Sequence, residues 1–185
     1  MTLHRPTARD ALIAAAFDVF SKDPSASLAQ IADRAGVGRA TLHRQFASRE
    51  ALFRELALIA IKEIDEAVTV ATADAKTATD ALRRTVFAVI PLGGRQGFLA
   101  GETGIDDPNV LAEYQRQSDE LYALIDASKA EGGFDRTIPT DWIAQAFEGL
   151  VYAAWEAVRL DQLTQKQAGD LAWRTLLSGL QDASQ

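Results

Sequence analysis

Residues 28–46 read LAQIADRAGVGRATLHRQF, and this stretch decides how the chain is interpreted. Residues 28–35 have the apolar spacing of a short helix. A glycine at position 36 favours a tight turn, because such turns between short helices usually need a positive φ. A second short helix, over residues 39–46, begins within three residues. The segment therefore predicts a helix-turn-helix.

The second helix of this pair would keep one face free. Val37 would fill the turn, while Leu42 and Phe46 would pack the second helix against the first. An exposed helix of about two turns fits the major groove, where Arg pairs with guanine and small side chains touch the thymine methyl group. We therefore expect contacts to double-stranded operator DNA from Arg39, Ala40, Thr41, His43, Arg44 and Gln45. For the flanking phosphates we expect Ser48, Arg49, Arg5 and Arg9.

The remaining sequence predicts helices nearly throughout. Capping residues open several of them, with Thr7 before the first helix and capping boxes at Ser27 and Thr164. Asp107-Pro108 predicts another helix start. The expected helices cover about residues 8–22, 28–35, 39–46, 48–73, 77–90, 107–130, 139–160 and 164–180. We interpret Gly93-Gly-Arg-Gln-Gly97 as a plain loop between helices, because it lacks the Lys and Ser or Thr of a phosphate-binding loop.

Net charge divides the 185 residues into two parts. The whole chain carries −7, which at first disfavours a nucleic-acid partner. Residues 1–55, however, hold eight basic and six acidic residues, while the other 130 hold 11 basic and 20 acidic ones. The head, residues 1–55, thus has a net charge of +2, and the body, residues 56–185, has a net charge of −9. We predict two domains, residues 1–50 for DNA binding and residues 51–185 for ligand binding and dimerisation.

Residues 8–55 resemble the N-terminal domain of the TetR family of bacterial transcriptional repressors. The resemblance rests on Phe17-Asp-Val-Phe20, Leu28-Ala-Gln-Ile-Ala32, Ala35-Gly-Val37, Thr41-Leu42, Phe46 and Arg49-Glu-Ala-Leu52. It implies an all-α protein: a three-helix helix-turn-helix domain followed by a helical-bundle ligand-binding and dimerisation domain. It also implies a homodimeric repressor that a small-molecule inducer releases from its operator.

Three positions depart from the family pattern. His43 stands where the family usually has Tyr, Gln45 where His is common, and Arg49 where Lys is usual. Arg in place of Lys should still hold a phosphate. His is largely neutral near pH 7 and is shorter than Tyr, so we expect the contact of His43 either to reach a different atom or to be absent.

The body supplies expectations for a ligand and for a partner copy. The resemblance places a largely apolar cleft among the middle helices, and from the aromatic content we select Phe87, Ile90, Phe98, Tyr114, Phe147 and Tyr152 as its lining. The alternative for each of these residues is that it only fills the hydrophobic core and contacts no ligand. Small side chains recur in the last two helices at Ala146, Gly149, Ala153, Ala157, Ala168, Ala172, Thr175 and Gly179. Such stripes allow close helix packing, so we expect a homodimer through these helices.

Several classes of protein are disfavoured. The chain has no Cys and only two His, His4 and His43, so neither a metal site nor a catalytic triad is expected, and nothing calls for a cofactor. No uncharged run nears the roughly 20 residues of a membrane helix, and we expect a cytoplasmic, non-enzymatic protein. A helical ligand-binding or adaptor protein whose head does not bind DNA remains the main alternative, and an all-α enzyme a more remote one.

Overall fold

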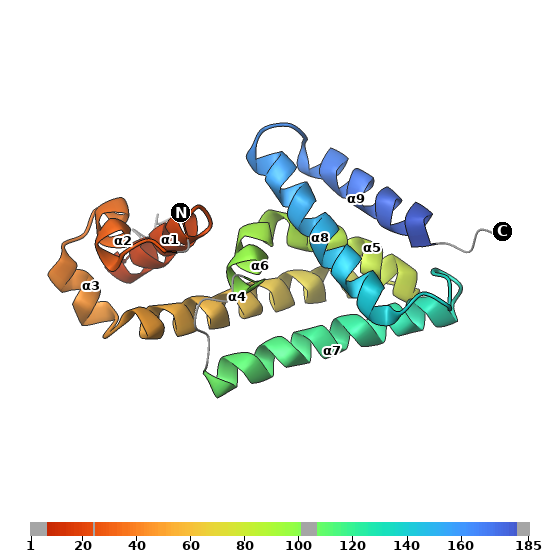
Figure 1. Ribbon diagram of the computed structural model, residues 1–185, viewed down its shortest axis with the longest axis horizontal. Helices are drawn as coiled ribbons and strands as arrows, with labels where there is room; N and C mark the ends of the chain where they lie inside the picture. The colour runs from red at the N-terminus through yellow and green to blue at the C-terminus, as the bar shows by residue number, and fades with distance from the viewer. Residues whose placement is uncertain (1–6, 24, 101–106, 181–185) are drawn as a thin grey trace. The chain divides into compact units, whose positions relative to one another are not determined.

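The computed structural model describes residues 7–23, 25–100 and 107–180, and every regular element within these ranges is helical. The predicted Arg5 contact and His4 lie outside them. In chain order the elements are α1 (Ala8–Phe20), α2 (Leu28–Ala35), α3 (Arg39–Gln45), α4 (Arg49–Thr72), α5 (Ala78–Val89), the 3₁₀ turn η1 (Ile90–Leu92), α6 (Gly93–Ala100), α7 (Pro108–Ala130), α8 (Thr140–Arg159) and α9 (Gln165–Leu180) (Figure 1). The all-α prediction is confirmed.

The chain forms two compact units that do not follow the order of the sequence. The first unit comprises residues 1–60 and 94–111, and the second comprises residues 61–93 and 112–185. The predicted domain division lies between residues 50 and 51, whereas the compact units divide within α4, after Ala60. The first turns of α4 bury Leu52, Phe53 and Leu56 in the first unit, and this burial places them with the head.

Most helix starts follow the predicted capping chemistry. The Oγ1 atom of Thr7 accepts a hydrogen bond from the amide of Asp10 at 3.1 Å. Ser27 and Thr164 begin α2 and α9 in the same way, with their hydroxyls accepting from the amides of Gln30 and Gln167. In return, the side-chain Oε1 atoms of these two glutamines accept hydrogen bonds from the amides of the capping residues. Each side chain satisfies an amide that the first helical turn leaves without a partner.

The predicted loop over residues 93–97 is wrong. These residues belong to α6, although three of its first five residues are glycines and glycine disfavours helices. Gly93 is buried, and a Cβ atom there would collide with the side chain of Trp155. Packing in the second unit therefore requires glycine at position 93, and tertiary contacts outweigh the low intrinsic propensity.

Aromatic side chains form much of the first unit's core. Phe98 of α6 packs against Phe17, Phe20 and Phe53, with ring centroids 5.6, 6.2 and 5.3 Å apart. The guanidinium of Arg95 lies 3.9 Å from the centroid of the Phe17 ring, which is a close cation–π contact. Phe98 and Arg95 thus complete the core of a unit whose other core residues are distant in sequence.

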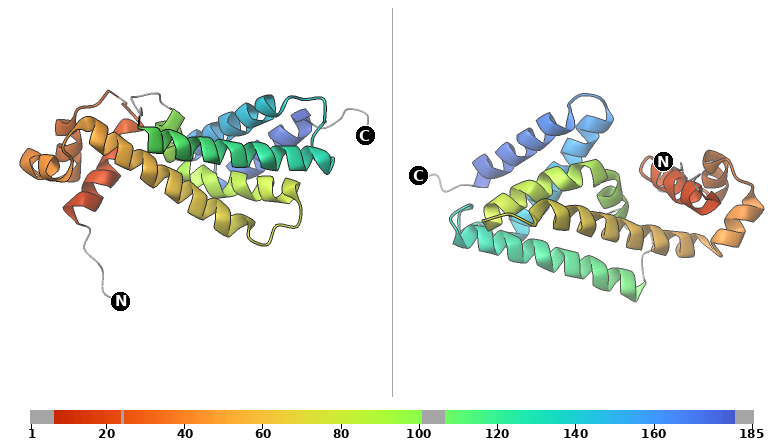
Figure 2. Two further views of the ribbon diagram at one scale, coloured as in Figure 1. Left: turned by 90° about the horizontal axis from the view of Figure 1, so that it is seen from below. Right: turned by 180° about the vertical axis from the view of Figure 1, so that it is seen from behind.

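The second unit is a helical bundle, and its α8 packs most extensively on α9 (Figure 2). Its core joins apolar side chains of α5, η1, α7, α8 and α9, including the fully buried Leu82, Ile125, Ile143 and Val151. No helix in the described ranges has both the length and the apolar character needed to span a membrane.

Candidate nucleic-acid interface

The helix-turn-helix forms as the sequence predicted. Gly36 ends α2 at φ 67°, a left-handed conformation that glycine adopts without strain. The amide of Val37 then donates to the carbonyl of Ala32 at 3.0 Å, which closes the turn. Leu42 and Phe46 are almost fully buried, so α3 is fixed by one face.

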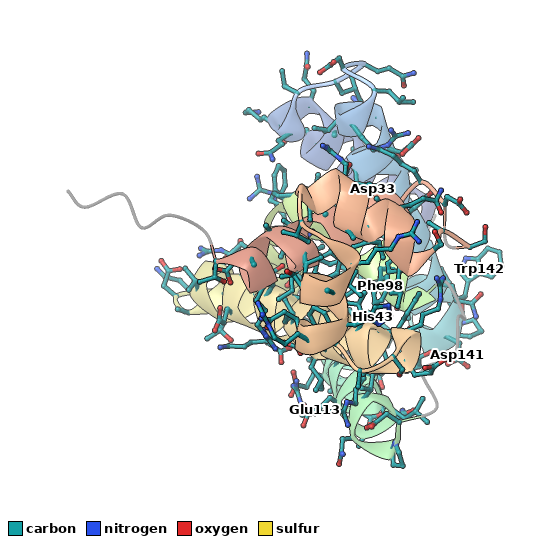
Figure 3. The ribbon with its side chains drawn as sticks, turned by 90° about the vertical axis from the view of Figure 1, so that its left-hand side faces the viewer. Asp33, His43, Phe98, Glu113, Asp141 and Trp142 are labelled. Carbon is teal, nitrogen blue, oxygen red and sulfur yellow. The ribbon has the colours of Figure 1, made fainter. Side chains whose placement is uncertain are left out.

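The opposite face of α3 is open. Arg39, Ala40, His43 and Arg44 are exposed, while Thr41 and Gln45 are partly buried. Figure 3 shows His43 on this helix and Asp33 on α2. Among the described residues, neither Arg39 nor Arg44 is close enough to a carboxylate for an ion pair. Two cations and a histidine therefore project from a rigidly packed helix without internal partners, and such a face can meet a polyanion.

Other arginines of the head are engaged within the chain. Arg9 pairs with Glu55, and its guanidinium also lies 5.7 Å from the centroid of the Phe46 ring. Arg34 contacts Asp18 at 2.7 Å, and Lys22 contacts the same carboxylate at 2.5 Å. Hydrogen bonds from Lys22 and Arg34 lower the pKa of Asp18. This pairing holds α1 and α2 together and leaves Arg34 less available for DNA than an unpaired arginine.

Arg49, another of the predicted phosphate contacts, makes several contacts within the head. Its guanidinium lies 5.0 Å from the Phe20 ring and 4.7 Å from the Phe53 ring, and its Nη1 donates to the carbonyl of Ala26. These contacts join the end of α1, the residue before the capping box of α2, and the first turn of α4. Arg49 therefore positions three elements of the head, a role that the spacing of charges alone did not reveal.

Ser48 is also used internally. Its Oγ accepts a hydrogen bond from the amide of Ala51 at 3.2 Å, as expected of a helix cap. A hydrogen bond from the Ser48 side chain lowers the pKa of the neighbouring Glu50 carboxyl. Ser48 is partly buried, so its first role in the chain is to begin α4.

The six residues predicted to line a ligand cleft fall into different environments. Phe98 belongs to the aromatic core of the first unit. The other five belong to the second unit, where Ile90 and Phe147 are core residues and Phe87 packs beside them against α9. Tyr114 and Tyr152 are 38% and 50% exposed, so they reach the surface of that unit.

The small residues of α8 and α9 also divide into two groups. Ala168 and Ala172 are buried in the bundle's core, where they allow α9 to pack within the same chain. Gly149 and Ala153 are exposed on α8, and Thr175 and Gly179 are exposed on α9. The same two helices also carry exposed apolar residues, Tyr152 on α8 and Leu171 on α9.

One candidate residue was missed in the sequence. Glu148 is half-buried in α8, and burial raises the pKa of its carboxyl. The available signal was its isolation, since Glu148 is the only charged residue between Asp141 and Glu156. No grouping of three or more His, Cys, Asp or Glu suited to a metal ion occurs in the described parts of the chain.

Comparison with known proteins agrees with this geometry. The family described as "Bacterial regulatory proteins, tetR family" matches residues 12–56, which span α2, α3 and parts of the flanking helices. The HTH-type transcriptional repressor LfrR of Mycolicibacterium smegmatis is 30% identical over 177 residues, covering 95% of this chain and 92% of the relative.

Solved structures show the same fold over most of the chain. The TetR-like regulator LfrR from Mycobacterium smegmatis in complex with proflavine is 29% identical, has a TM-score of 0.75, and covers 95% of this chain and 97% of its own. The ketosteroid transcriptional regulator KstR2 of Mycobacterium tuberculosis has a TM-score of 0.77 at 18% identity, with 97% of both chains covered, and supports the fold. The chain therefore belongs to the TetR family of bacterial regulatory proteins and is a DNA-binding transcriptional regulator.

Proposed function

We propose that the protein is a homodimeric repressor that a small-molecule inducer releases from its operator. One observation carries the proposal: α3 is held by the buried Leu42 and Phe46 and presents Arg39 and Arg44 without ion-pair partners among the described residues. A recognition helix must be held in place by one packed face, and its opposite face must keep hydrogen-bond donors available for DNA. In a helix that only packs the fold, such arginines would gain by pairing with nearby acids.

The base contacts would come from the exposed part of α3. Arg39 and Arg44 carry donors that match guanine, and Ala40 and Thr41 offer methyl groups for thymine. His43 and Gln45 complete this surface. Arg5 remains a proposed backbone contact. Ser48, Arg9 and Arg49, which were also expected at the phosphates, form bonds within the chain, and we propose that they hold the head in position instead.

A dimer would provide the second half-site. Two recognition helices about 34–36 Å apart would enter successive major grooves on one face of the duplex. The exposed small residues Gly149 and Ala153, together with Tyr152 and Leu171, support a subunit interface through α8 and α9. Small side chains allow backbones to approach closely, and the apolar residues gain by leaving water.

Induction would act through the elements shared by the two units. α4 passes from the first unit into the second after Ala60, and residues 94–111 return the chain to the first unit. A ligand that changes the second unit would therefore act on the head through α4 and through Phe98. The proflavine complex of LfrR supports a small-molecule ligand for the second unit. Reversing a strong operator preference would require a differential affinity of about 5 kcal/mol.

The test is a titration of operator DNA. Labelled duplexes covering the DNA beside the protein's own gene are titrated at several salt concentrations and followed by fluorescence anisotropy. We expect one duplex to bind far better than random DNA, with affinity falling steeply as salt rises because phosphate contacts release counterions. Arg44→Ala should lower the operator affinity by about 1–3 kcal/mol and narrow the preference over random DNA.

A matched control separates recognition from general charge. Lys76→Ala removes one exposed positive charge from the second unit and should leave operator binding unchanged. If every tested duplex binds as random DNA does, a helical ligand-binding or adaptor protein becomes the better account of the chain.

A further inference from the structure

Two long helices belong to both compact units. α4 (Arg49–Thr72) is continuous across the boundary between the units, which falls after Ala60. α7 (Pro108–Ala130) is continuous across the same boundary, which falls after Leu111. Apart from the proline that begins α7, neither helix contains the Pro or Gly residues at which kinks usually occur. The way in which the bundle holds these helices therefore bears on how far the head can move.

α7 holds α4 by two hydrogen bonds from one side-chain amide. The Nε2 atom of Gln117 donates to the backbone carbonyl of Ile61 at 2.9 Å and to Oδ1 of Asp65 at 2.6 Å. All three residues belong to the second unit, and Ile61 is the first residue of α4 in that unit. The side chain of Ile61 is buried. α4 is thus held in its first turn after it enters the bundle.

Arg116 binds the same carboxylate. Its Nη2 forms an ion pair with Oδ2 of Asp65, while its Nε and Nη1 bind Glu113 at 2.9 Å and Glu120 at 2.7 Å. These two glutamates lie on α7, one turn to either side of Arg116, and hold its guanidinium in place. Both oxygens of Asp65 are therefore bound to α7. We call the contacts of Arg116 and Gln117 with Asp65 and Ile61 the α4–α7 joint.

The α4–α7 joint fixes α4 more closely than a surface ion pair does. An exposed ion pair contributes little, because two flexible side chains can follow each other's movement. A backbone carbonyl moves with the helix itself, so the bond from Gln117 depends on the position of α4. A shift of α4 by one residue would carry the Ile61 carbonyl about 1.5 Å along the helix axis and about 100° around it. Such a shift would break the bond.

A separate contact joins the same two helices within the first unit. The Nη1 atom of Arg54 in α4 lies 3.7 Å from Oδ2 of Asp107. Asp107 immediately precedes α7, and its Oδ1 accepts hydrogen bonds from the amides of Asn109 and Val110 in the first turn. α4 and α7 are therefore tied to each other on both sides of the unit boundary. Two helices tied in this way resist bending and rotation better than one helix alone.

We propose that Arg116 and Gln117 are positioning residues for operator recognition: by fixing α4 where it enters the bundle, they restrict the movement of the head and limit the protein to one half-site spacing. This role rests on the proposed function, because spacing matters only if two heads bind one operator. The exposed residues of α3 would select the bases of each half-site. The α4–α7 joint would select the distance between the half-sites.

The first test measures the movement of the head and needs no DNA. The chain has no Cys, so Asp33→Cys on α2 and Gln145→Cys on α8, both at exposed positions, provide the two attachment points for spin labels. Labelled full-length protein is diluted into excess unlabelled protein, so that double electron–electron resonance reports the distance within one chain. We expect Gln117→Leu, which removes both bonds of the amide, to broaden the distance distribution clearly.

A second glutamine of α7 provides the matched control. The Nε2 atom of Gln115 donates to Asp119 at 2.8 Å, so its bond stays within α7. Gln115→Leu should therefore keep the distance distribution of the unsubstituted chain. Asp65→Asn keeps the size of the side chain and removes the charge that Arg116 binds, and it should broaden the distribution as Gln117→Leu does. Circular dichroism melting checks that each variant is folded.

The second test measures the preference for half-site spacing. Three duplexes are titrated by fluorescence anisotropy: the operator, the operator with one base pair inserted between its half-sites, and a duplex with a single half-site. The insertion moves one half-site by about 3.4 Å along the duplex and about 35° around it. Wild type should lose affinity about tenfold on insertion, and Gln117→Leu about threefold or less, with single half-site affinity within about twofold of wild type.

The outcomes separate this proposal from the proposed function. An unchanged distance distribution in both Gln117→Leu and Asp65→Asn overturns the role of the joint in holding the head. Equal losses on insertion in wild type and Gln117→Leu overturn its role in selecting spacing. Equal weakening of the operator and the single half-site does the same, because a general loss of folded protein affects both duplexes alike. If no duplex binds better than random DNA, the proposed function fails, and the distance measurement still decides whether the joint restricts the head.

Discussion

The head and the bundle use unpaired charge in opposite ways. In the head, Asp18 and Glu55 are paired, while the arginines of α3 project without ion-pair partners among the described residues. In the bundle, Arg84, Arg116 and Arg159 are paired, while the half-buried Glu148 has no ion-pair partner in the described part of the chain. Water solvates the exposed arginines of α3, whereas the half-buried Glu148 has lost part of its hydration. The comparison teaches that the lack of an ion-pair partner has different consequences in the two units: it leaves the exposed arginines of α3 available to a polyanion, and it makes the charge of Glu148 unfavourable for folding.

The largest expected effect is a loss of operator affinity when the proposed dimer is disrupted, because the two heads then no longer bind both half-sites together. Gly149→Arg places a long, charged side chain on the exposed face of α8, where a Cβ atom would meet nothing within 4 Å. The folded monomer should therefore tolerate it, while a close subunit interface should not. We expect loss of the dimer in analytical ultracentrifugation and a fall in operator affinity of ~100-fold or more, because one subunit contacts one half-site.

A control tests whether the position or the added charge is responsible. Ala123→Arg adds the same side chain to an exposed position of α7 and should leave the dimer intact. If Gly149→Arg remains a dimer of wild-type affinity, the copies associate through another surface.

A smaller effect is expected from substituting Arg49, which makes contacts within the head, than from disrupting the dimer. Arg49→Ala removes cation–π contacts to Phe20 and Phe53 and the hydrogen bond to the Ala26 carbonyl. We expect a loss of about 1–2 kcal/mol in the free energy of unfolding, measured in urea. The salt dependence of DNA binding should remain that of wild type.

Arg44→Ala should show the reverse pattern, with weaker binding at unchanged stability. A decrease of about one in the salt slope of Arg49→Ala, without loss of stability, would instead make Arg49 a phosphate contact.

The smallest effect is a difference in pH dependence between the two units. In the bundle, the raised pKa of Glu148 means that its charge opposes folding at neutral pH. As pH falls through the raised pKa toward the ordinary value of 4.5, the folded state takes up the proton first and the penalty disappears. Glu148→Gln should therefore have a higher free energy of unfolding than wild type at pH 7. This difference should shrink as the pH falls through the raised pKa toward 4.5.

In the head, Asp18 has a lowered pKa and should show the opposite sign. Its paired carboxylate stabilises the fold above the ordinary value of 3.8, and that stability is lost as pH falls through the lower folded-state pKa. Asp18→Asn should be less stable than wild type at pH 7 and approach it in acid. Urea unfolding at several pH values measures both variants, and effects of the same sign would contradict the comparison.

The sequence predicted the features that depend on neighbouring residues. Helix caps at Thr7, Ser27 and Thr164, the turn at Gly36 and the buried face of α3 all follow from local spacing and local hydrogen bonds. Such features need no knowledge of distant contacts, and they were enough to recognise the DNA-binding head.

Features that depend on distant contacts were predicted poorly. Gly93 favours a loop by its own propensity, yet its contact with Trp155 places it in a helix. Phe98 is among the aromatic residues predicted to line a ligand cleft, but its partners are Phe17, Phe20 and Phe53. The half-burial of Glu148 depends on the packing of α8 against distant parts of the chain, so its local sequence did not predict it.

The path of the chain has a consequence for protein engineering. Because residues 94–111 belong to the first unit, the DNA-binding unit cannot be exchanged as one continuous N-terminal segment. A fragment ending at residue 60 would lack Phe98 and Arg95, and three phenylalanine rings would lose a packing partner. Chimaeras that exchange only the first sixty residues with a relative would pair foreign rings with a native α6. Transplanting the specificity of this regulator therefore requires grafting the two separate segments together, or changing only the outward residues of α3.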